Sequence, residues 1–392
     1  MEKKIYVVMK QSPHFHQMSL DEFLFGENPN LRTIINPNET NTRTWEVDRV
    51  SDTFRTIADV PVIIRKLAEF NRKTAALHEV ERHTLYREFY IPKKSGGLRK
   101  IDAPNDDLMT ALRELKSIFE NKCHALYHTS AFAYVKKRCT LDAVKRHQAN
   151  ESRWFAKYDF SNFFGSTTKE FVLQQFGMIY PFSEIMKSEE GRPELKKALD
   201  LAFLDGGLPQ GTPISPLITN IMMIPIDFKL CNMFRDFRFT GRDGEVARNY
   251  CVYTRYADDI LISSKYDFNF IDAERAINDV LAEFNAPFKI KKEKTRYGSS
   301  AGSNWNLGVM LNRENKITIG HRKKRQFKAM LTSYVMDRKS GIKWDINDIQ
   351  VMNGTKNYYT QVEKESIEEI VAKLSNKFGV DIEEAIKQDL RS

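Results

Sequence analysis

The sequence predicts an α+β fold, in which antiparallel strand pairs alternate with separate apolar helices. Strand-like segments recur in pairs around short polar turns, as in residues 87–104 and 251–264, which is typical of hairpins. Elsewhere apolar residues recur three and four positions apart, as in residues 106–122, which is typical of a helix packed on one face. At 392 residues the chain is long enough for two or three domains.

Composition favours a polyanionic partner without identifying one. Lysine and arginine total 61 against 52 acidic residues, a formal net charge of +9, which also describes many solubilised surfaces. No apolar run approaches membrane-spanning length, and the amino terminus is too poor in apolar residues for a secretion signal. We therefore expect a cytoplasmic protein with no membrane partner. The cysteines are dispersed without metal-binding spacing and are predicted to be free thiols: Cys123, Cys139, Cys231 and Cys251.

The sequence pattern predicts the order of the secondary-structure elements along the chain. Residues 1–85 are predicted to form an N-terminal extension, irregular at first and helical from about Val60 to Arg87. A hairpin with a basic turn at Lys93 to Gly97 and an apolar helix come next. Residues 154–165 read as a strand, residues 207–223 as a Gly- and Pro-marked turn with an apolar helix, and residues 304–320 as a hairpin with Asn315 near its turn. A basic helix opens the C-terminal region at residue 321.

Three aspartates indicate where chemistry could occur. Asp258 and Asp259 are adjacent at a predicted strand turn, where they repel each other unless cations neutralise them. Asp159 interrupts an apolar strand, where an unpaired carboxylate would be costly. If the two strands pair, the acids form a cluster of hard oxygen ligands, which suits Mg²⁺ and two-metal phosphoryl transfer. A lone pair of aspartates is more often a solvated turn, so this pair does not decide the matter by itself.

Four ordered motifs resemble those of reverse transcriptases over residues 88–335. YADD at 256–259 resembles the catalytic tetrapeptide, and YDFSNFFGS at 158–166 resembles motif A. LPQGTPISP at 208–216 resembles motif B, and FYIPKKSGGLRKI at 89–101 resembles the fingers hairpin of bacterial reverse transcriptases. YADD alone would be a weak signal, but order, spacing and residue types agree in all four.

The resemblance implies a right-hand polymerase. Fingers and a palm with a split βαβ core would occupy residues 86–320, and a short, mainly helical thumb would occupy residues 321–392, after the extension of residues 1–85. Asp159, Asp258 and Asp259 would be the catalytic residues and metal ligands, together with the backbone carbonyl of Phe160. The resemblance implies two Mg²⁺ ions, with Mn²⁺ as a substitute.

The resemblance also implies contacts with nucleotide and nucleic acid. Phe164 matches the residue that closes on the sugar 2′ carbon and excludes ribonucleotides; plain core packing is the alternative. Lys294 would also be the proton donor to the leaving pyrophosphate. The other implied nucleotide contacts are Lys94, Arg99, Lys100, Gln210, Gly211 and Lys294. A thumb helix would contact the backbone of a nucleic-acid duplex through Arg322, Lys323, Lys324, Arg325 and Lys328. A solvated helix face with no nucleic-acid contact would have a similar sequence.

PQGTPISPLITN and YADDILIS resemble the retron-like and defence-associated bacterial branch. That branch implies an RNA-directed DNA polymerase that uses deoxynucleotides to copy a structured noncoding RNA into cDNA in prokaryotic antiviral defence. The implied partners are the RNA template and the RNA/DNA duplex product, with a homo-oligomer or an accessory defence protein left open. Three alternatives also stay open: template-independent or protein-primed DNA synthesis of abortive-infection type, RNA synthesis, and a catalytically silent RNA-binding scaffold.

Overall fold

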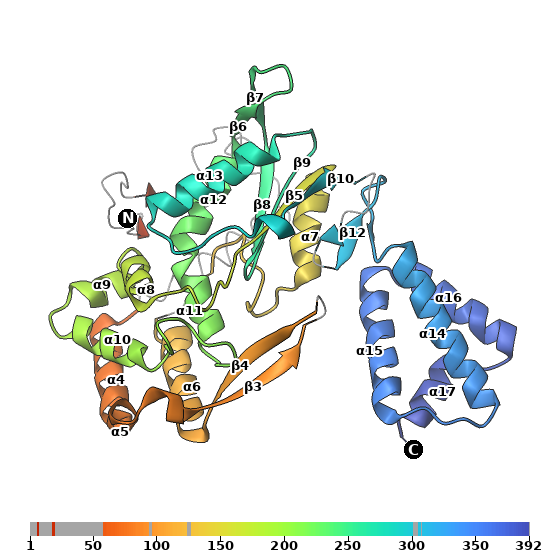
Figure 1. Ribbon diagram of the computed structural model, residues 1–392, viewed down its shortest axis with the longest axis horizontal. Helices are drawn as coiled ribbons and strands as arrows, with labels where there is room; N and C mark the ends of the chain where they lie inside the picture. Colours follow the sequence, from red (N-terminus) through yellow and green to blue (C-terminus); the bar gives the residue numbers. More distant parts are fainter. Residues whose placement is uncertain are drawn as a thin grey trace, which may run out of the picture.

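The computed structural model describes residues 58–391 apart from 94–95, 124–126, 301–304 and 307, together with the backbone of residues 6–7, 18–19 and 305–306. Figure 1 shows a larger lobe built around a mixed arrangement of helices and strands, and a smaller lobe of helices at the carboxyl end. Lys94 and most of the predicted N-terminal extension lie outside the described residues.

The central sheet of the larger lobe has the strand order β10-β5-β9-β8. Its strands are β5 (Trp154–Asp159), β8 (Cys251–Tyr256), β9 (Asp259–Ser264) and β10 (Arg296–Ser299). Each neighbouring pair is antiparallel, so β5 and β8 run in the same direction with β9 inserted between them. This is the predicted split βαβ core, and it confirms the right-hand polymerase fold.

Different helices cover the two faces of this sheet, because successive strand residues point to opposite faces. On β8, Tyr253 and Arg255 point towards α12 (Ile224–Arg235), where both bond to Asp227. Thr254, between them, points towards α7 (Thr140–Ala149) and bonds to His147. α13 (Phe270–Glu283) packs against α12 and connects β9 to β10.

The fingers part precedes and interrupts the sheet. β3 (Tyr86–Pro92) and β4 (Leu98–Pro104) form the predicted basic hairpin, and α6 (Asp106–Asn121) follows directly. The Asn105 side chain caps α6 by accepting a 2.9 Å hydrogen bond from the backbone N–H of Leu108. Between β5 and α11 (Ser215–Met222) lie α8 (Lys169–Phe176), α9 (Phe182–Lys187) and α10 (Gly191–Asp200).

The last part of the predicted extension packs into this lobe. α4 (Val60–Lys73) lies against α10 and α6, with Leu67 and Phe70 fully buried in the main hydrophobic core. Short helical turns, α5 (Ala75–Glu79) and η1 (Arg82–Leu85), then lead into β3. Residues 58–85 therefore share the core of the fingers, while the proposed boundary at residue 85 stays a prediction.

Two details differ from the sequence prediction. The strand predicted over residues 154–165 ends at Asp159, because the backbone N–H groups of Phe160 and Ser161 bond to Asp258 and Lys289 and the chain then turns. A hairpin of β6 (Phe237–Thr240) and β7 (Val246–Asn249) projects from the larger lobe and was not predicted (Figure 1).

A small sheet joins the two lobes. β12 (Val309–Leu311) pairs with β11 (Trp305–Asn306) and β13 (Ile317–Thr318), and Asn315 lies in the β12–β13 turn with a φ of +59°. Val309 and Leu311 pack on Phe155, Leu261 and Val144 of the larger lobe. The sheet is thereby fixed to the face of the palm that carries Asp159.

The smaller lobe contains α14 (His321–Lys339), α15 (Ile346–Val362), α16 (Lys364–Phe378) and α17 (Ile382–Asp389). Its buried side chains form a hydrophobic cluster separate from the main core, including Phe327, Leu331 and Met352. This lobe matches the thumb position in the predicted chain order; its domain boundary remains a prediction.

Among the described helices, no single one is long and apolar enough to cross a membrane. α11 and α12 reach that length and apolar content only when they are counted together, and they meet at a bend of 47°. Both contribute to the main hydrophobic core, for example through Ile218 and Leu230.

Candidate active site

Strand pairing brings the three predicted acids to one edge of the sheet. Asp159 ends β5 and lies opposite Asp259, which begins β9. Asp258 occupies the two-residue loop between β8 and β9, and its backbone carbonyl accepts a 3.0 Å hydrogen bond from the N–H of Phe160. Residues distant in the sequence thus meet through backbone hydrogen bonds, which fix their relative positions.

Two lysines balance part of this negative charge. Lys294 Nζ donates to both carboxylate oxygens of Asp159, each at 2.8 Å. Lys157 Nζ lies 2.9 Å from Asp259 Oδ2. Lys157 is two residues before Asp159 on β5, so both side chains are on the same face of the sheet.

The acids remain short of positive charge. Burial raises the pKa of Asp259 to about 6, with repulsion from Asp258 and Asp159 adding to the rise and Lys157 opposing it. Burial also raises the pKa of Asp258, and the charge of Asp159 contributes. Asp259 Oδ1 is buried and has no hydrogen-bond partner. An unpaired carboxylate oxygen beside other acids is an environment that a cation would stabilise.

The donor set fits a hard divalent cation. Carboxylate oxygens are the ligands that such ions prefer, and Asp159, Asp258 and Asp259 are the residues that would hold them. As they lie here, the described side chains include no group of three His, Cys, Asp or Glu residues arranged to hold a metal ion. Instead, Lys157 and Lys294 occupy carboxylate oxygens that ions would take.

A cavity of about 1510 Å³ opens over the acids. It is bounded by the fingers hairpin on one side and by the motif B segment on another. The predicted nucleotide contacts that line it are Arg99, Lys100, Phe164, Gln210, Gly211 and Lys294. The structure therefore brings together every predicted nucleotide-binding residue that it describes.

Phe164 and its neighbour Phe163 have different surroundings. Phe163 is 3% exposed and packs on Phe160 and Phe288 in the main core. Phe164 is half-buried and lines the cavity, where its ring centroid lies 6.4 Å from that of Tyr134 at an interplanar angle of 73°. Both rings border the cavity, but Phe163 is almost fully buried in the core, whereas the greater exposure of Phe164 in the cavity wall fits the predicted sugar selection.

Gly211 permits a close approach between the palm and the fingers. Its φ is +124°, and a Cβ atom there would lie 2.9 Å from the carbonyl oxygen of Asp102 on β4. The preceding carbonyl, of Gln210, accepts a 2.9 Å hydrogen bond from the N–H of Asp102. The sequence interpretation placed the close approach at nucleotide and template; the structure shows that the fingers strand already needs this glycine.

The two basic candidates on β4 differ in their partners. Lys100 forms ion pairs with Glu88 at 2.8 Å and Asp102 at 3.2 Å, both within its own hairpin. Arg99 is exposed and lines the same cavity as Tyr134; burial raises the pKa of Tyr134, and the charge of Arg99 opposes that rise. Arg99 is therefore the better placed of the two to meet a triphosphate.

The predicted thumb contacts separate into two groups. Lys323 Nζ donates to the carbonyl of Gly308 at 2.5 Å, and Lys324 pairs with Glu363 at the junction of α15 and α16, so both hold local structure. The remaining three are exposed on α14, namely Arg322, Arg325 and Lys328. None of the five lines the cavity over the acids.

Sequence reasoning missed two residues of the site. Lys157 could have been found, because a lysine two positions before Asp159 on a strand must share its face. Tyr134 gave no local signal: it adopts a φ of +59° in a segment without regular structure, and only the fold brings it to Phe164.

Comparison with known proteins agrees with this geometry. Residues 91–329 match the sequence profile described as "Reverse transcriptase (RNA-dependent DNA polymerase)". The retron Ec83 reverse transcriptase of Escherichia coli is 27% identical over 78% of this chain and 90% of its own length. The retron Ec73 enzyme of E. coli is 28% identical over 55% of this chain and 65% of its own length.

Two further similarities cover smaller shares of the related protein. The retron Mx162 reverse transcriptase of Myxococcus xanthus is 30% identical over 47% of this chain and 37% of its own length. The solved structure of apo telomerase from Candida tropicalis has a TM-score of 0.42 and 12% identity, covering 74% of this chain and 59% of that one.

Proposed function

Because this chain belongs to the reverse-transcriptase family of RNA-directed DNA polymerases, we propose that it copies an associated structured noncoding RNA into cDNA in prokaryotic antiviral defence. The choice of template is supported by similarity to retron reverse transcriptases, which extends over 90% of the Ec83 enzyme. The family uses divalent metal ions and an RNA template; magnesium as the working ion and the noncoding RNA as the template are our proposals.

One observation carries the catalytic part of the proposal. Asp159, Asp258 and Asp259 meet at one sheet edge, under a cavity with a basic fingers wall and Phe164 in its lining. This combines a place for metal ions, a place for a triphosphate and a wall against the sugar. A binding scaffold without catalysis would not need three acids that repel one another.

Each residue then has a defined task. The three aspartates would hold two Mg²⁺ ions, whose chemistry when bound is to lower the pKa of the primer hydroxyl and to neutralise charge on the pyrophosphate. The Arg99 guanidinium binds the triphosphate, and the Phe164 ring excludes a 2′-hydroxyl. Burial opposes the charge of Lys294, but its hydrogen bond to Asp159 raises its pKa overall. Lys294 is therefore protonated beside the acids, and we assign to it the proton that the leaving group receives.

The experiment begins with the protein expressed from its own locus. The copurifying RNA is sequenced, and the complex is supplied with Mg²⁺ and labelled deoxynucleotides. We expect a discrete DNA complementary to the bound RNA, with Asp258→Ala lowering its synthesis at least about 1,000-fold. Chelation should stop synthesis, and Mg²⁺ or Mn²⁺ should restore it. DNA without complementarity to any bound RNA would instead indicate template-independent synthesis and would overturn the proposal.

A further inference from the structure

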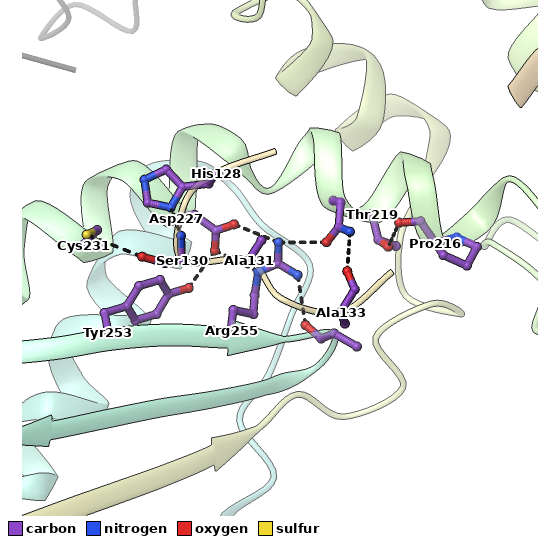
Figure 2. Close-up of polar contacts among 12 residues, drawn as sticks. His128, Ser130, Ala131, Ala133, Pro216, Thr219, Asp227, Cys231, Tyr253 and Arg255 are labelled. Atoms are coloured by element: carbon purple, nitrogen blue, oxygen red, sulfur yellow. Dashed lines mark hydrogen bonds and ion pairs between the residues drawn. The ribbon is translucent and has the colours of Figure 1, made fainter. Parts of the chain in front are cut away.

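A fully buried ion pair lies behind the catalytic turn (Figure 2). Arg255 on β8 and Asp227 on α12 are both 0% exposed. The Arg255 Nε and Nη2 atoms each donate to a different oxygen of Asp227 at 2.8 Å. Tyr253 donates its hydroxyl to the same carboxylate at 2.7 Å. The guanidinium is thereby fixed in both position and plane.

The third nitrogen of this guanidinium holds the turn itself. Arg255 Nη1 donates to the backbone carbonyl of Ala257 at 3.1 Å. Ala257 has a φ of +57°, a backbone region that residues other than glycine rarely adopt. Because the peptide unit is planar, holding this carbonyl also sets the direction of the Asp258 N–H. Asp258 follows Ala257 directly, so orienting this peptide also orients the backbone from which an acid of the active site projects.

Asn220 connects the ion pair to the wall of the cavity. Arg255 Nη2 donates to Asn220 Oδ1 at 3.3 Å, and Asn220 Nδ2 donates to the carbonyl of Ala133 at 2.7 Å. Tyr134, the next residue, lines the cavity beside Phe164. Figure 2 shows the sheet, the long helices and the segment around Ala133 converging on Arg255. One buried cation therefore contacts the catalytic turn and is linked to the nucleotide pocket.

Stability alone does not account for such a pair. Removing two charges from water is costly, and apolar side chains of similar volume often stabilise a core as well or better. What apolar side chains lack is direction, because hydrophobic contacts do not fix the orientation of a carbonyl group. The position of Asp258 depends on the orientation of the Ala257 carbonyl, which only a polar contact can fix.

We propose that Arg255, held by Asp227 and Asn220, is a positioning residue that orients the Ala257–Asp258 peptide for nucleotide addition. The proposal rests on the polymerase function and adds a residue that touches neither substrate nor metal. It separates two contributions of the buried pair: packing, which apolar residues can replace, and orientation, which they cannot replace.

The test uses the double substitution Arg255→Met and Asp227→Leu in the full chain with its RNA. We expect the template–primer affinity to stay near wild type and the melting temperature to fall, because Tyr253, Asn220 and Ala257 each lose a buried hydrogen bond. At a temperature where the variant is folded, kcat should fall about 10- to 100-fold and KM for deoxynucleotides should change less than about twofold. Mn²⁺ binding without nucleotide, followed by electron paramagnetic resonance, should weaken several-fold. Wild-type kcat and Mn²⁺ affinity in the double variant would overturn the proposal.

Asn220→Ala provides a second route if the double variant does not fold. We expect a fall in kcat of about 3- to 10-fold at unchanged template–primer affinity. Thr219→Val is the matched control: it lies on the same helix, is equally buried and loses one hydrogen bond, to the Pro216 carbonyl at 3.0 Å (Figure 2). Equal kcat values in these two variants would overturn the proposal. An inactive wild-type protein would instead refute the proposed function.

Discussion

The sheet lobe and the C-terminal lobe use different interactions in their interiors. Behind the catalytic turn, the sheet lobe buries charged and polar groups that bond to one another, such as Arg255 with Asp227 and His147 with Thr254. The C-terminal lobe has a mainly apolar interior. Lys356 is buried there, but its partner Glu383 is exposed, and the pair of Arg338 with Asp389 also lies nearer the surface.

This difference follows from what each lobe must position. Polar contacts are directional, so they can fix the position and orientation of a carboxylate or a carbonyl. Apolar packing is not directional and stabilises a shape without orienting single atoms. A lobe that carries reacting atoms needs the first kind of interior, whereas a lobe that follows a nucleic-acid backbone can use the second.

The largest expected effect tests whether the two interiors are independent. Leu331→Ala removes a fully buried side chain of the C-terminal cluster and should cost about 2–5 kcal/mol. Because the clusters are separate, calorimetry should show one thermal transition moving while another stays. Leu112→Ala, at a fully buried position in the main core, should move the other transition. One shared transition that both variants lower equally would contradict this separation.

A substitution at Phe164 tests how strongly the cavity wall discriminates between ribonucleotides and deoxynucleotides. Phe164→Ala opens the cavity lining where a 2′-hydroxyl would collide, so ribonucleotide incorporation relative to deoxynucleotide should rise about 10- to 100-fold. Competition assays with both nucleotides measure this ratio. Phe171→Leu, at a buried core position that does not line the cavity, should leave the ratio unchanged. Sugar selectivity that does not respond in Phe164→Ala would rule out the steric role.

The exposed basic face of α14 tests the C-terminal lobe as a backbone contact. Replacing its three cations with glutamine should weaken template–primer binding about tenfold at 0.15 M salt and reduce the salt dependence, with kcat unchanged at saturating template. The variant carries Arg322→Gln, Arg325→Gln and Lys328→Gln.

A charge-matched control removes three exposed lysines from α16, through Lys364→Gln, Lys373→Gln and Lys377→Gln. We expect this control to change the affinity much less. Equal losses in both triple variants would mean that the total charge, and not the face of α14, governs binding.

The smallest effect concerns the polar interior of the sheet lobe at low pH. His147 is buried, and both ring nitrogens bond to hydroxyls, Ser263 Oγ at 2.6 Å and Thr254 Oγ1 at 2.8 Å. Burial lowers its pKa from 6.5 to about 3. Above pH 6.5 the ring is neutral in both states and costs no stability. As the pH falls from 6.5 towards 3, only the unfolded state takes up the proton, so the free energy of unfolding falls by roughly 1.4 kcal/mol per pH unit.

Urea unfolding of the sheet lobe at pH 7.5, 6.0 and 5.0 measures this dependence. His147→Gln should flatten it by about one proton between pH 6 and 5, because the substituted side chain does not titrate. An unchanged slope in the variant would assign the acid sensitivity to other groups, among them His128, whose pKa burial lowers to about 4.

The sequence by itself determined the class of chemistry. The hairpins and helices were predictable because a period of two or of three to four residues records which side chains each element buries. The acids Asp159, Asp258 and Asp259 were recognisable because carboxylates in or beside apolar strands are costly without a use. The family resemblance, confirmed by the profile match, added the order of fingers, palm and thumb.

Only the tertiary structure decided which groups meet. Lys157 and Lys294 approach the acids, and Tyr134 faces Phe164. Lys323 bonds to Gly308 beside the joining sheet and Lys324 pairs with Glu363, because strand register and helix docking set these distances. Arg255 is the clearest case: in the sequence it is one more basic residue beside YADD, and in the fold it is fully buried against Asp227. Sequence patterns record local periodicity, whereas the partners of a buried charge come from segments far apart in the chain.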